Sequence, residues 1–488
     1  MALNELSAKQ LSDLRDHPDL ARLPESGSGD DGTRVGLPTA TALVTGSIIG
    51  TGIFTVPAAL AGFGTIGLLA FVVVAIGAMA LAALFATLAS KRPAAGGPYA
   101  YAREAFGDFG GFTTAWSYWL TSWAGNAAIV TGWVLYVAAF FSGWLGWSLT
   151  SGRDLFLLAL LGLWIPAVIN LSGVRQMGWF QVATTVVKFL PLAFLAMFGL
   201  FFVQSANFGP FNVSGTGWFD ALSAAGVVVL FSFLGVETAS VAAGKVRNPG
   251  RNVPRATLIG TAASALVYIL CTVAIFGVVG TSALTESGAP FADAFSSILG
   301  STDAGTAVAL LAAISGFGCL VGWTLICGEM PYAAAKDGLF PKAFAKTIRG
   351  NVPWFGITVS TVLAMVFTWI SYGLPSFGGY LASEATGLDV FLTLVFLTGV
   401  TAAIPYFFSA LAQVYWLFTD PDRPHGGRLA RDLSVSVLAG LFSIWFVYGS
   451  GAEATYWAFL MLLVGFVVYA VMLVQRTREA RVLDLSDR

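Results

Sequence analysis

Two charged side chains stand inside long apolar stretches of this sequence. Glu237 lies within residues 231–240 (FSFLGVETAS), which also hold a glycine and three hydroxyl residues. Lys188 lies within residues 184–189 (TTVVKF). An ionisable residue in such a segment is expensive to bury and commonly marks a path for ions, protons or polar solutes. Glu237 is therefore a candidate proton acceptor that couples protonation to release of a bound solute. The alternative is a carboxylate that bonds a helix terminus and never titrates.

A glycine-rich segment interrupts the first apolar run. Residues 46–54 (GSIIGTGIF) combine three glycines with Ser47 and Thr51. Glycines weaken a helix, and unwound backbone at membrane depth is tolerated only where protein buries it or where it lines a polar cavity. Its N–H and carbonyl groups would bind the charged ends of a small solute. The alternative is a face of small residues that packs against another helix.

Lys188 also has two interpretations. It lies about one to two helical turns inside the membrane from the nearer end of its apolar run. Either its long stem snorkels to the surface, or its ammonium occupies a cation position beside residues 46–54. In that position it would replace a sodium ion or carry a proton. Glu329, near the end of a later apolar run, is either a boundary residue or the partner of Lys188.

Aromatic and amide side chains in the apolar runs supply further candidates. An ammonium group is attracted to aromatic faces, so a box of aromatic residues would suit an amine or an amino acid. The candidates for such a box are Tyr118, Trp119, Trp123, Phe231, Trp323 and Tyr406. Most of the 15 tryptophans must instead serve packing or the membrane interface. Asn126 either contacts solute or bonds a neighbouring helix.

Histidine and cysteine placement argues against an enzyme or a metal site. His17 and His425 lie in polar segments, and the three cysteines have no metal-ligand spacing: Cys271, Cys319 and Cys327. An intramembrane enzyme would need a nucleophile–base pair or a metal cluster, and the sequence offers neither. We therefore expect no catalytic residue, no metal and no cofactor.

Helices that cross a membrane must position these residues. Of 488 residues, 57% are hydrophobic and 10% are charged, whereas soluble domains carry ~25% charged residues. A bilayer core needs roughly 20 apolar helical residues to cross it. The sequence predicts an all-α polytopic membrane protein with 12 transmembrane helices, within residues 41–62, 66–90, 112–141, 155–171, 181–203, 219–243, 256–279, 304–327, 354–370, 388–418, 433–448 and 456–475. The net charge of −1 gives no indication of a nucleic-acid partner.

The two interrupted runs occupy corresponding positions, because runs 1 and 6 are each the first of five. Interruptions placed in this way are typical of transporters built from inverted repeats, and they favour an occludable site over a channel. We expect a 5+5 inverted repeat with broken helices 1 and 6, followed by two peripheral helices. The expected units are a mobile tail (1–36), the transport core (37–430), the peripheral pair (431–476) and a second tail (477–488).

Basic residues alternate between the connections. Arg153 is the single Lys or Arg in the connections on one side of the predicted membrane, and the other side holds Lys91, Arg92, Arg103, Arg175, Lys245, Arg247, Arg251, Arg255, Lys336, Lys342, Lys346, Arg349, Arg423, Arg428, Arg431, Arg476, Arg478 and Arg481. The positive-inside rule then places both termini in the cytoplasm. We expect a multi-pass protein of the cell membrane.

Several motifs resemble those of the amino acid–polyamine–organocation superfamily. They are GTGIF at 50–54, GGPYAYAR at 96–103, YWL at 118–120, GN at 125–126, SFLGVETAS at 232–240, NPGRNVP at 248–254, GWT at 322–324 and DGLFP at 337–341. The resemblance runs from about residue 37 to 476 and is greatest to the basic amino-acid/polyamine antiporters of the arginine/agmatine type. It implies alternating access, a substrate that is an amino acid or an amine, and a homodimer in the bilayer.

The resemblance also implies roles for particular residues. Backbone near Ile48, Thr51 and Gly52 would take the carboxylate of the solute, and carbonyls near Phe231 and Gly235 its α-amine. The remaining assignments are Asn126 and Thr398 to the substrate site, Trp323 to an occluding aromatic, Tyr118 and Glu237 to the gate near the substrate, Tyr406 to the distal gate and Tyr99 to pH sensing.

Three positions depart from the arginine/agmatine pattern. Phe231 stands in place of a tryptophan that stacks on the substrate, Ser47 in place of asparagine, and Lys188 in place of a small residue. Proton-coupled and sodium-independent permeases of the superfamily carry such a lysine. We therefore expect a sodium-independent antiporter that exchanges an amino acid for an amine or another amino acid. The alternative is a proton-coupled amino-acid uptake permease.

Overall fold

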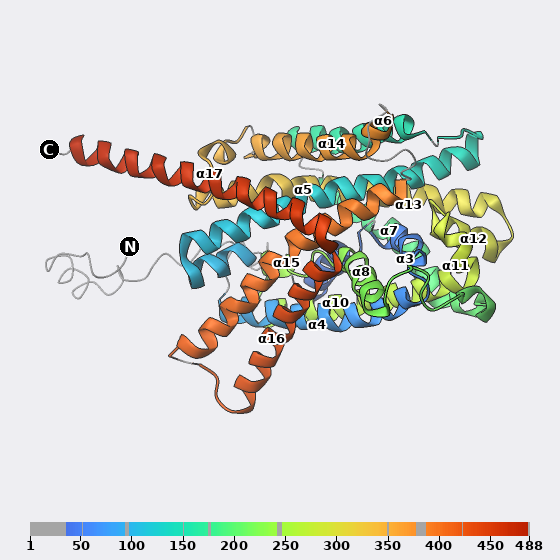
Figure 1. Ribbon diagram of the computed structural model, residues 1–488, viewed down its shortest axis with the longest axis horizontal. Coiled ribbons are helices and arrows are strands. Elements are labelled where there is room, and N and C mark those ends of the chain that lie inside the picture. Colours follow the sequence, from blue (N-terminus) through green and yellow to red (C-terminus); the bar gives the residue numbers. More distant parts are fainter. Residues whose placement is uncertain are drawn as a thin grey trace.

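The computed structural model of the protein describes residues 36–50, 52–92, 97–149, 151–173, 177–241, 246–348, 351–376, 387–421 and 423–486. This part of the chain is almost entirely helical, and most of its long helices lie along the longest axis of the molecule (Figure 1). The main helices are α2 (Leu37–Ile48), α3 (Gly52–Ala61), α4 (Ile66–Lys91), α5 (Pro98–Leu145), α6 (Gly152–Leu171), α7 (Met177–Phe198), α8 (Trp218–Phe231), α9 (Thr238–Val241), α10 (Pro249–Val279), α11 (Thr281–Thr285), α12 (Pro290–Leu299), α13 (Thr302–Lys336), α14 (Trp354–Ser376), α15 (Gly387–Thr419), α16 (Gly427–Gly449) and α17 (Gly451–Ser486).

Among the described residues, 9 helices are long and apolar enough to cross a membrane. The bent pair α2 and α3, whose axes differ by 41°, would make a tenth span. Two further apolar stretches are shorter, at 10–17 residues: Val186–Phe202, which begins inside α7 and runs past its end, and Trp218–Phe231, which is α8. A polytopic helical membrane protein is thus confirmed, while the number of 12 spans stays a prediction.

Both predicted interruptions are present. The α2 helix ends at Ile48 and α3 begins at Gly52, and α8 ends at Phe231 before α9 begins at Thr238. Near the first break the backbone N–H of Gly50 bonds the carbonyl of Ile48 at 2.7 Å, which closes a tight turn instead of continuing the helix. The helix is therefore interrupted at the glycines, as their low helix propensity predicts.

Several helices run further than their apolar runs. The α5 helix has 48 residues, and Gly107, with φ of 77°, interrupts it before the apolar part begins. The α13 helix continues to Lys336, so that Glu329 is helical, and α17 continues to Ser486 through what the sequence suggested was a tail. Residues 1–35 and 487–488 of the predicted tails lie outside the described residues.

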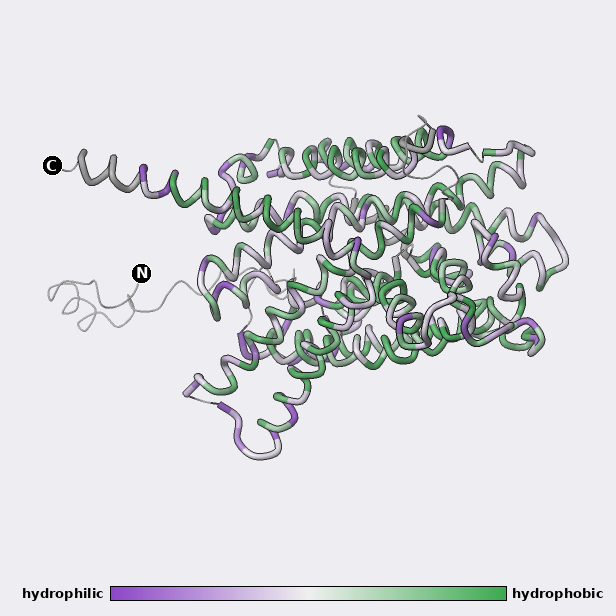
Figure 2. The backbone as a smooth tube through the Cα atoms, viewed as in Figure 1, coloured by the Kyte–Doolittle hydropathy of each residue, from purple (hydrophilic) through white to green (hydrophobic). Residues whose placement is uncertain are grey.

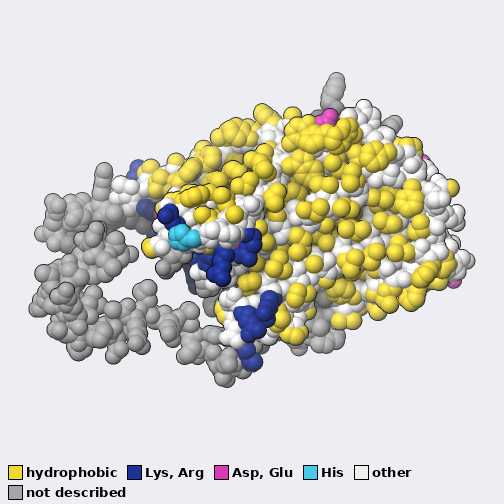
Figure 3. All heavy atoms as spheres, turned by 90° about the horizontal axis from the view of Figure 1, so that it is seen from below, with side chains coloured by type: hydrophobic (Ala, Val, Ile, Leu, Met, Phe, Trp, Pro, Cys, Tyr) yellow, Lys and Arg dark blue, Asp and Glu magenta, His cyan; other side chains and the backbone are white. Residues whose placement is uncertain are grey.

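The surface of the helices suits lipid. Figure 2 shows hydrophobic residues along the helices and hydrophilic ones mainly at helix ends and connections. Large apolar side chains such as Ile76, Met197 and Val467 are exposed by 65–67%. A soluble protein rarely exposes a continuous apolar surface, so this belt marks the membrane-facing region. On the face in Figure 3, lysines and arginines gather at the end of the molecule where α17 ends.

Candidate functional site

A small cavity lies between the two helix breaks. It is lined by Ser47, Ile48, Gly50, Gly52, Gly125, Ile129, Phe231, Ser232, Leu234, Cys319 and Trp323. Its volume is about 20 Å³, which is room for about one water molecule and far less than an amino acid needs. The structure therefore has the cavity closed.

The Lys188 side chain bonds the backbone at the first helix break. It is 4% exposed, and its ammonium donates hydrogen bonds to the carbonyl oxygens of Gly46 at 2.8 Å and Ile49 at 2.5 Å. Carbonyls at the C-terminal end of a helix lack partners within the helix and carry partial negative charge. The ammonium therefore lies against two carbonyl oxygens beside the first break, and its role as a cation substitute stays a prediction. Glu329 is exposed on α13, and both of its interpretations stay predictions.

Tyr268 joins the two breaks, and the sequence analysis missed it. This α10 residue is fully buried, and its hydroxyl lies 2.8 Å from the carbonyl oxygen of Ile48 and 3.2 Å from that of Ser232. Its ring packs edge-on against Phe233. A phenol inside an apolar run needs a hydrogen-bond partner, and that need was the available signal.

Close approach of the two breaks favours glycine at two positions. A Cβ atom at Gly52 would lie 3.1 Å from the ring of Phe231. Gly235 has φ of +106°, and a Cβ there would lie 3.1 Å from the carbonyl oxygen of Ser47. Both glycines were predicted from the sequence, whereas Thr51 lies outside the described residues.

The Glu237 carboxylate accepts hydrogen bonds from two tyrosine hydroxyls on different helices. Tyr118 of α5 donates to Oε1 at 2.7 Å, and Tyr406 of α15 donates to Oε2 at 2.9 Å. Glu237 is 1% exposed, so these bonds replace water on both of its oxygens. The structure thus brings together the three residues that the resemblance assigned to gates.

Two of the six aromatic candidates, Phe231 and Trp323, line the cavity. Trp119 instead donates to the hydroxyl of Ser360 at 2.8 Å, and Trp123 packs against Phe367. The expected box is therefore not assembled in this closed form.

The two remaining substrate candidates, Asn126 and Thr398, are not among the described residues that line the cavity. The amide nitrogen of Asn126 donates to Thr324 at 3.0 Å, which matches the helix-bonding alternative, while its buried Oδ1 has no partner among the described residues. Thr398 donates to the carbonyl of Leu394 at 2.7 Å in its own helix. The Ser232 hydroxyl lines the cavity without a partner among the described residues, so it adds a polar contact that sequence reasoning did not single out.

Tyr99 takes part in a polar cluster at the end of the molecule where α17 ends. Its hydroxyl donates to Asp337 at 3.1 Å, and Arg103 and Arg476 both bond Asp108, at 2.9 Å and 3.2 Å. This cluster ties α5, the end of α13 and α17 together, some distance along the helices from the closed cavity.

A buried site between two broken helices inside an apolar belt defines a membrane transporter rather than an enzyme. The chain belongs to the amino acid permease family of the amino acid–polyamine–organocation superfamily, whose family model matches residues 35–479. It is 32% identical over 385 residues to the cadaverine/lysine antiporter of Escherichia coli (strain K12), covering 78% of this chain and 82% of that protein. It is 30% identical over 441 residues to the putrescine transporter PotE of the same strain, covering 90% of this chain and 96% of PotE.

Proposed function

We propose that this protein is a sodium-independent antiporter that exchanges an amino acid for an amine or another amino acid by alternating access. The observation that carries this proposal is the closed cavity between two helix breaks, with the Lys188 ammonium where a cation would bind. The naming of a relative as a cadaverine/lysine antiporter supports exchange and makes lysine and cadaverine the first pair to test.

Alternating access would use the breaks as follows. Backbone groups near Ile48, Thr51 and Gly52 would bind the carboxylate of the solute, and carbonyls near Phe231 and Gly235 its α-amine. Trp323 would occlude the bound solute. Tyr118 of α5 and Tyr406 of α15 each bond a different oxygen of Glu237. When the site opens, we expect these two helices to move apart and the two bonds to break.

The architecture that accompanies this proposal has 12 spans in a 5+5 inverted repeat, with α16 and α17 peripheral. The apolar parts of α7 and α8, together with the nine long helices and the bent pair, would supply the spans. Lysines and arginines gather at the end of the molecule where α17 ends, so this end would face the cytoplasm and both termini would be cytoplasmic. A homodimer would form in the bilayer.

Exchange and proton-coupled uptake can be separated with the purified protein in liposomes. Labelled lysine would be added outside liposomes that hold lysine, cadaverine, arginine, a neutral amino acid or none, at equal pH and with choline in place of sodium. Uptake that needs a loaded lumen is the expected result, and the best internal solute names the exchange pair.

The second candidate is a proton-coupled uptake permease, favoured by the burial of the Lys188 ammonium beside the first helix break. Uptake into empty liposomes that rises with an inward proton gradient would establish it and overturn the antiporter. Uptake that needs sodium would overturn the sodium-independence of either.

A further inference from the structure

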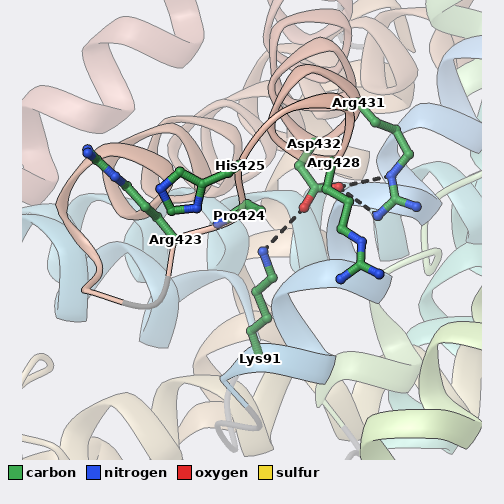
Figure 4. Close-up of a pocket in the computed structure, with 8 residues that line it drawn as sticks. Lys91, Arg423, Pro424, His425, Arg428, Arg431 and Asp432 are labelled. Carbon is green, nitrogen blue, oxygen red and sulfur yellow. Dashed lines mark hydrogen bonds and ion pairs between the residues drawn. The ribbon is translucent and has the colours of Figure 1, made fainter.

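A wide cleft lies away from the central cavity, between the end of α4 and the start of α16. It has a volume of about 1090 Å³ and is lined by Lys91, Arg423, Pro424, His425, Gly427, Arg428, Arg431 and Asp432. We call it the basic cleft. Figure 4 shows its side chains, which come from α4, from the connection between α15 and α16, and from the start of α16.

Positive charge exceeds negative charge in the basic cleft. Asp432, 4% exposed, accepts bonds from Lys91 at 3.2 Å and from Arg431 at 2.8 Å. Arg428 forms no ion pair with any residue that the structure describes, and Arg423 bonds a backbone carbonyl at 3.3 Å. Among the described residues that line the cleft, one carboxylate thus faces four basic side chains, which leaves the cleft suited to an anion.

The neighbouring charges that the structure describes, one arginine against two carboxylates, reduce this imbalance by one without removing it. Asp420 at the end of α15 is bonded by Arg92 at 2.6 Å, a residue that also pairs with Glu104. The excess charge therefore remains on Arg423 and Arg428, whose side chains Figure 4 shows without a partner among the residues drawn.

An apolar stripe continues from the basic cleft along α16. Residues three or four apart share a helix face, and Ser434, Leu438, Leu441 and Ile444 follow Arg431 in this spacing. The three apolar residues of this stripe are 53–59% exposed. A ligand with a phosphate at one end and acyl chains at the other would match both parts, whereas a soluble phosphate would use the cleft alone.

We propose that the basic cleft binds the headgroup phosphate of an anionic phospholipid, whose acyl chains lie along the apolar stripe of α16. Basic pockets between membrane helices on the cytoplasmic side suit such headgroups, and each basic residue near the surface strengthens the attraction. The bound phosphate would bridge α4 of the core and α16 of the peripheral pair, beside the existing contact of Lys91 with Asp432. The inference depends on the membrane orientation and not on the transported solute.

Lipid binding can be measured by native mass spectrometry of the full chain in detergent, titrated with phosphatidylglycerol or phosphatidylcholine. The test variant is Arg423→Gln with Arg428→Gln, which breaks no ion pair between described residues. The control is Arg251→Gln with Arg255→Gln, two exposed arginines of α10 at the same end. A basic side chain near an anionic surface contributes about a fivefold preference, so the loss of two should lower the phosphatidylglycerol affinity of the test variant about 25-fold.

Each outcome decides the proposal. Wild type and the control should prefer phosphatidylglycerol, and the test variant should not. Equal losses in both variants would mean diffuse surface charge and would overturn the proposal, as would an unchanged test variant. Displacement of the lipid by glycerol 3-phosphate or inorganic phosphate at equal concentration would overturn it in favour of a soluble anion. If the double variant does not fold, Arg428→Gln alone should lose about fivefold.

Discussion

Replacing Lys188 by methionine removes the charge at the first helix break and keeps most of the side chain's volume. Two hydrogen bonds from the ammonium would be lost, at 2.8 Å and 2.5 Å, and the carbonyls of Gly46 and Ile49 would be left without it. A hydrogen bond to a charged group contributes about 1.5–3 kcal/mol net, so the closed break should lose about 3–6 kcal/mol. The lower figure corresponds to a change of about 150-fold in the equilibrium between the closed and the opened form of the break.

The assay is lysine–cadaverine exchange in liposomes, combined with the melting temperature of the purified protein. Lys188→Met should reduce exchange by about 100-fold or more and lower the melting temperature. Lys336→Met is the matched control, because Lys336 is exposed at the end of α13 and lies over the ring of Tyr332 at 4.6 Å. The control should keep both properties.

A second variant tests whether the ammonium fills a cation position. Lys188→Ala leaves space beside the two carbonyls, so sodium should partly restore its exchange or its melting temperature. Full transport by Lys188→Met, with an unchanged melting temperature and pH dependence, would refute the reasoning and leave Lys188 a packing or snorkelling residue.

Three other substitutions test the site. Tyr406→Phe removes one of the two phenol bonds to Glu237 and should slow exchange about 10- to 150-fold with the fold intact; wild-type flux would contradict the gate. Trp323→Ala should abolish exchange far more than it lowers the melting temperature, and normal flux from this variant would remove Trp323 from the site. Gly235→Ala would force a Cβ against Ser47 at a φ of +106°, and should cost about 1–3 kcal/mol, read as a lower melting temperature; an unchanged value would mean that the break relaxes freely.

The sequence alone was sufficient for the class of protein and for the location of both helix breaks. Lipid offers no hydrogen-bond partners, so the backbone N–H and carbonyl groups of each span must bond within one helix. A run of apolar residues in the sequence is therefore enough to locate such a span. Glycine content showed the first break in the same way, and Gly235 and Glu237 showed the second. Helix ends such as those of α5 and α13 were less predictable, because polar helices continue past the apolar run.

Contacts between distant helices were decided by the tertiary structure. Lys188 meets Ile49 across 139 residues, Tyr406 meets Glu237 across 169, and Tyr268 meets Ile48 across 220. The sequence could name Lys188, Glu237 and Tyr406 as candidates but could not choose their partners. It also could not see that Trp119 and Trp123 turn away from the cavity. A helix that is apolar on every side carries no periodic signal for its rotation, so only packing against its neighbours sets which side chain faces which helix.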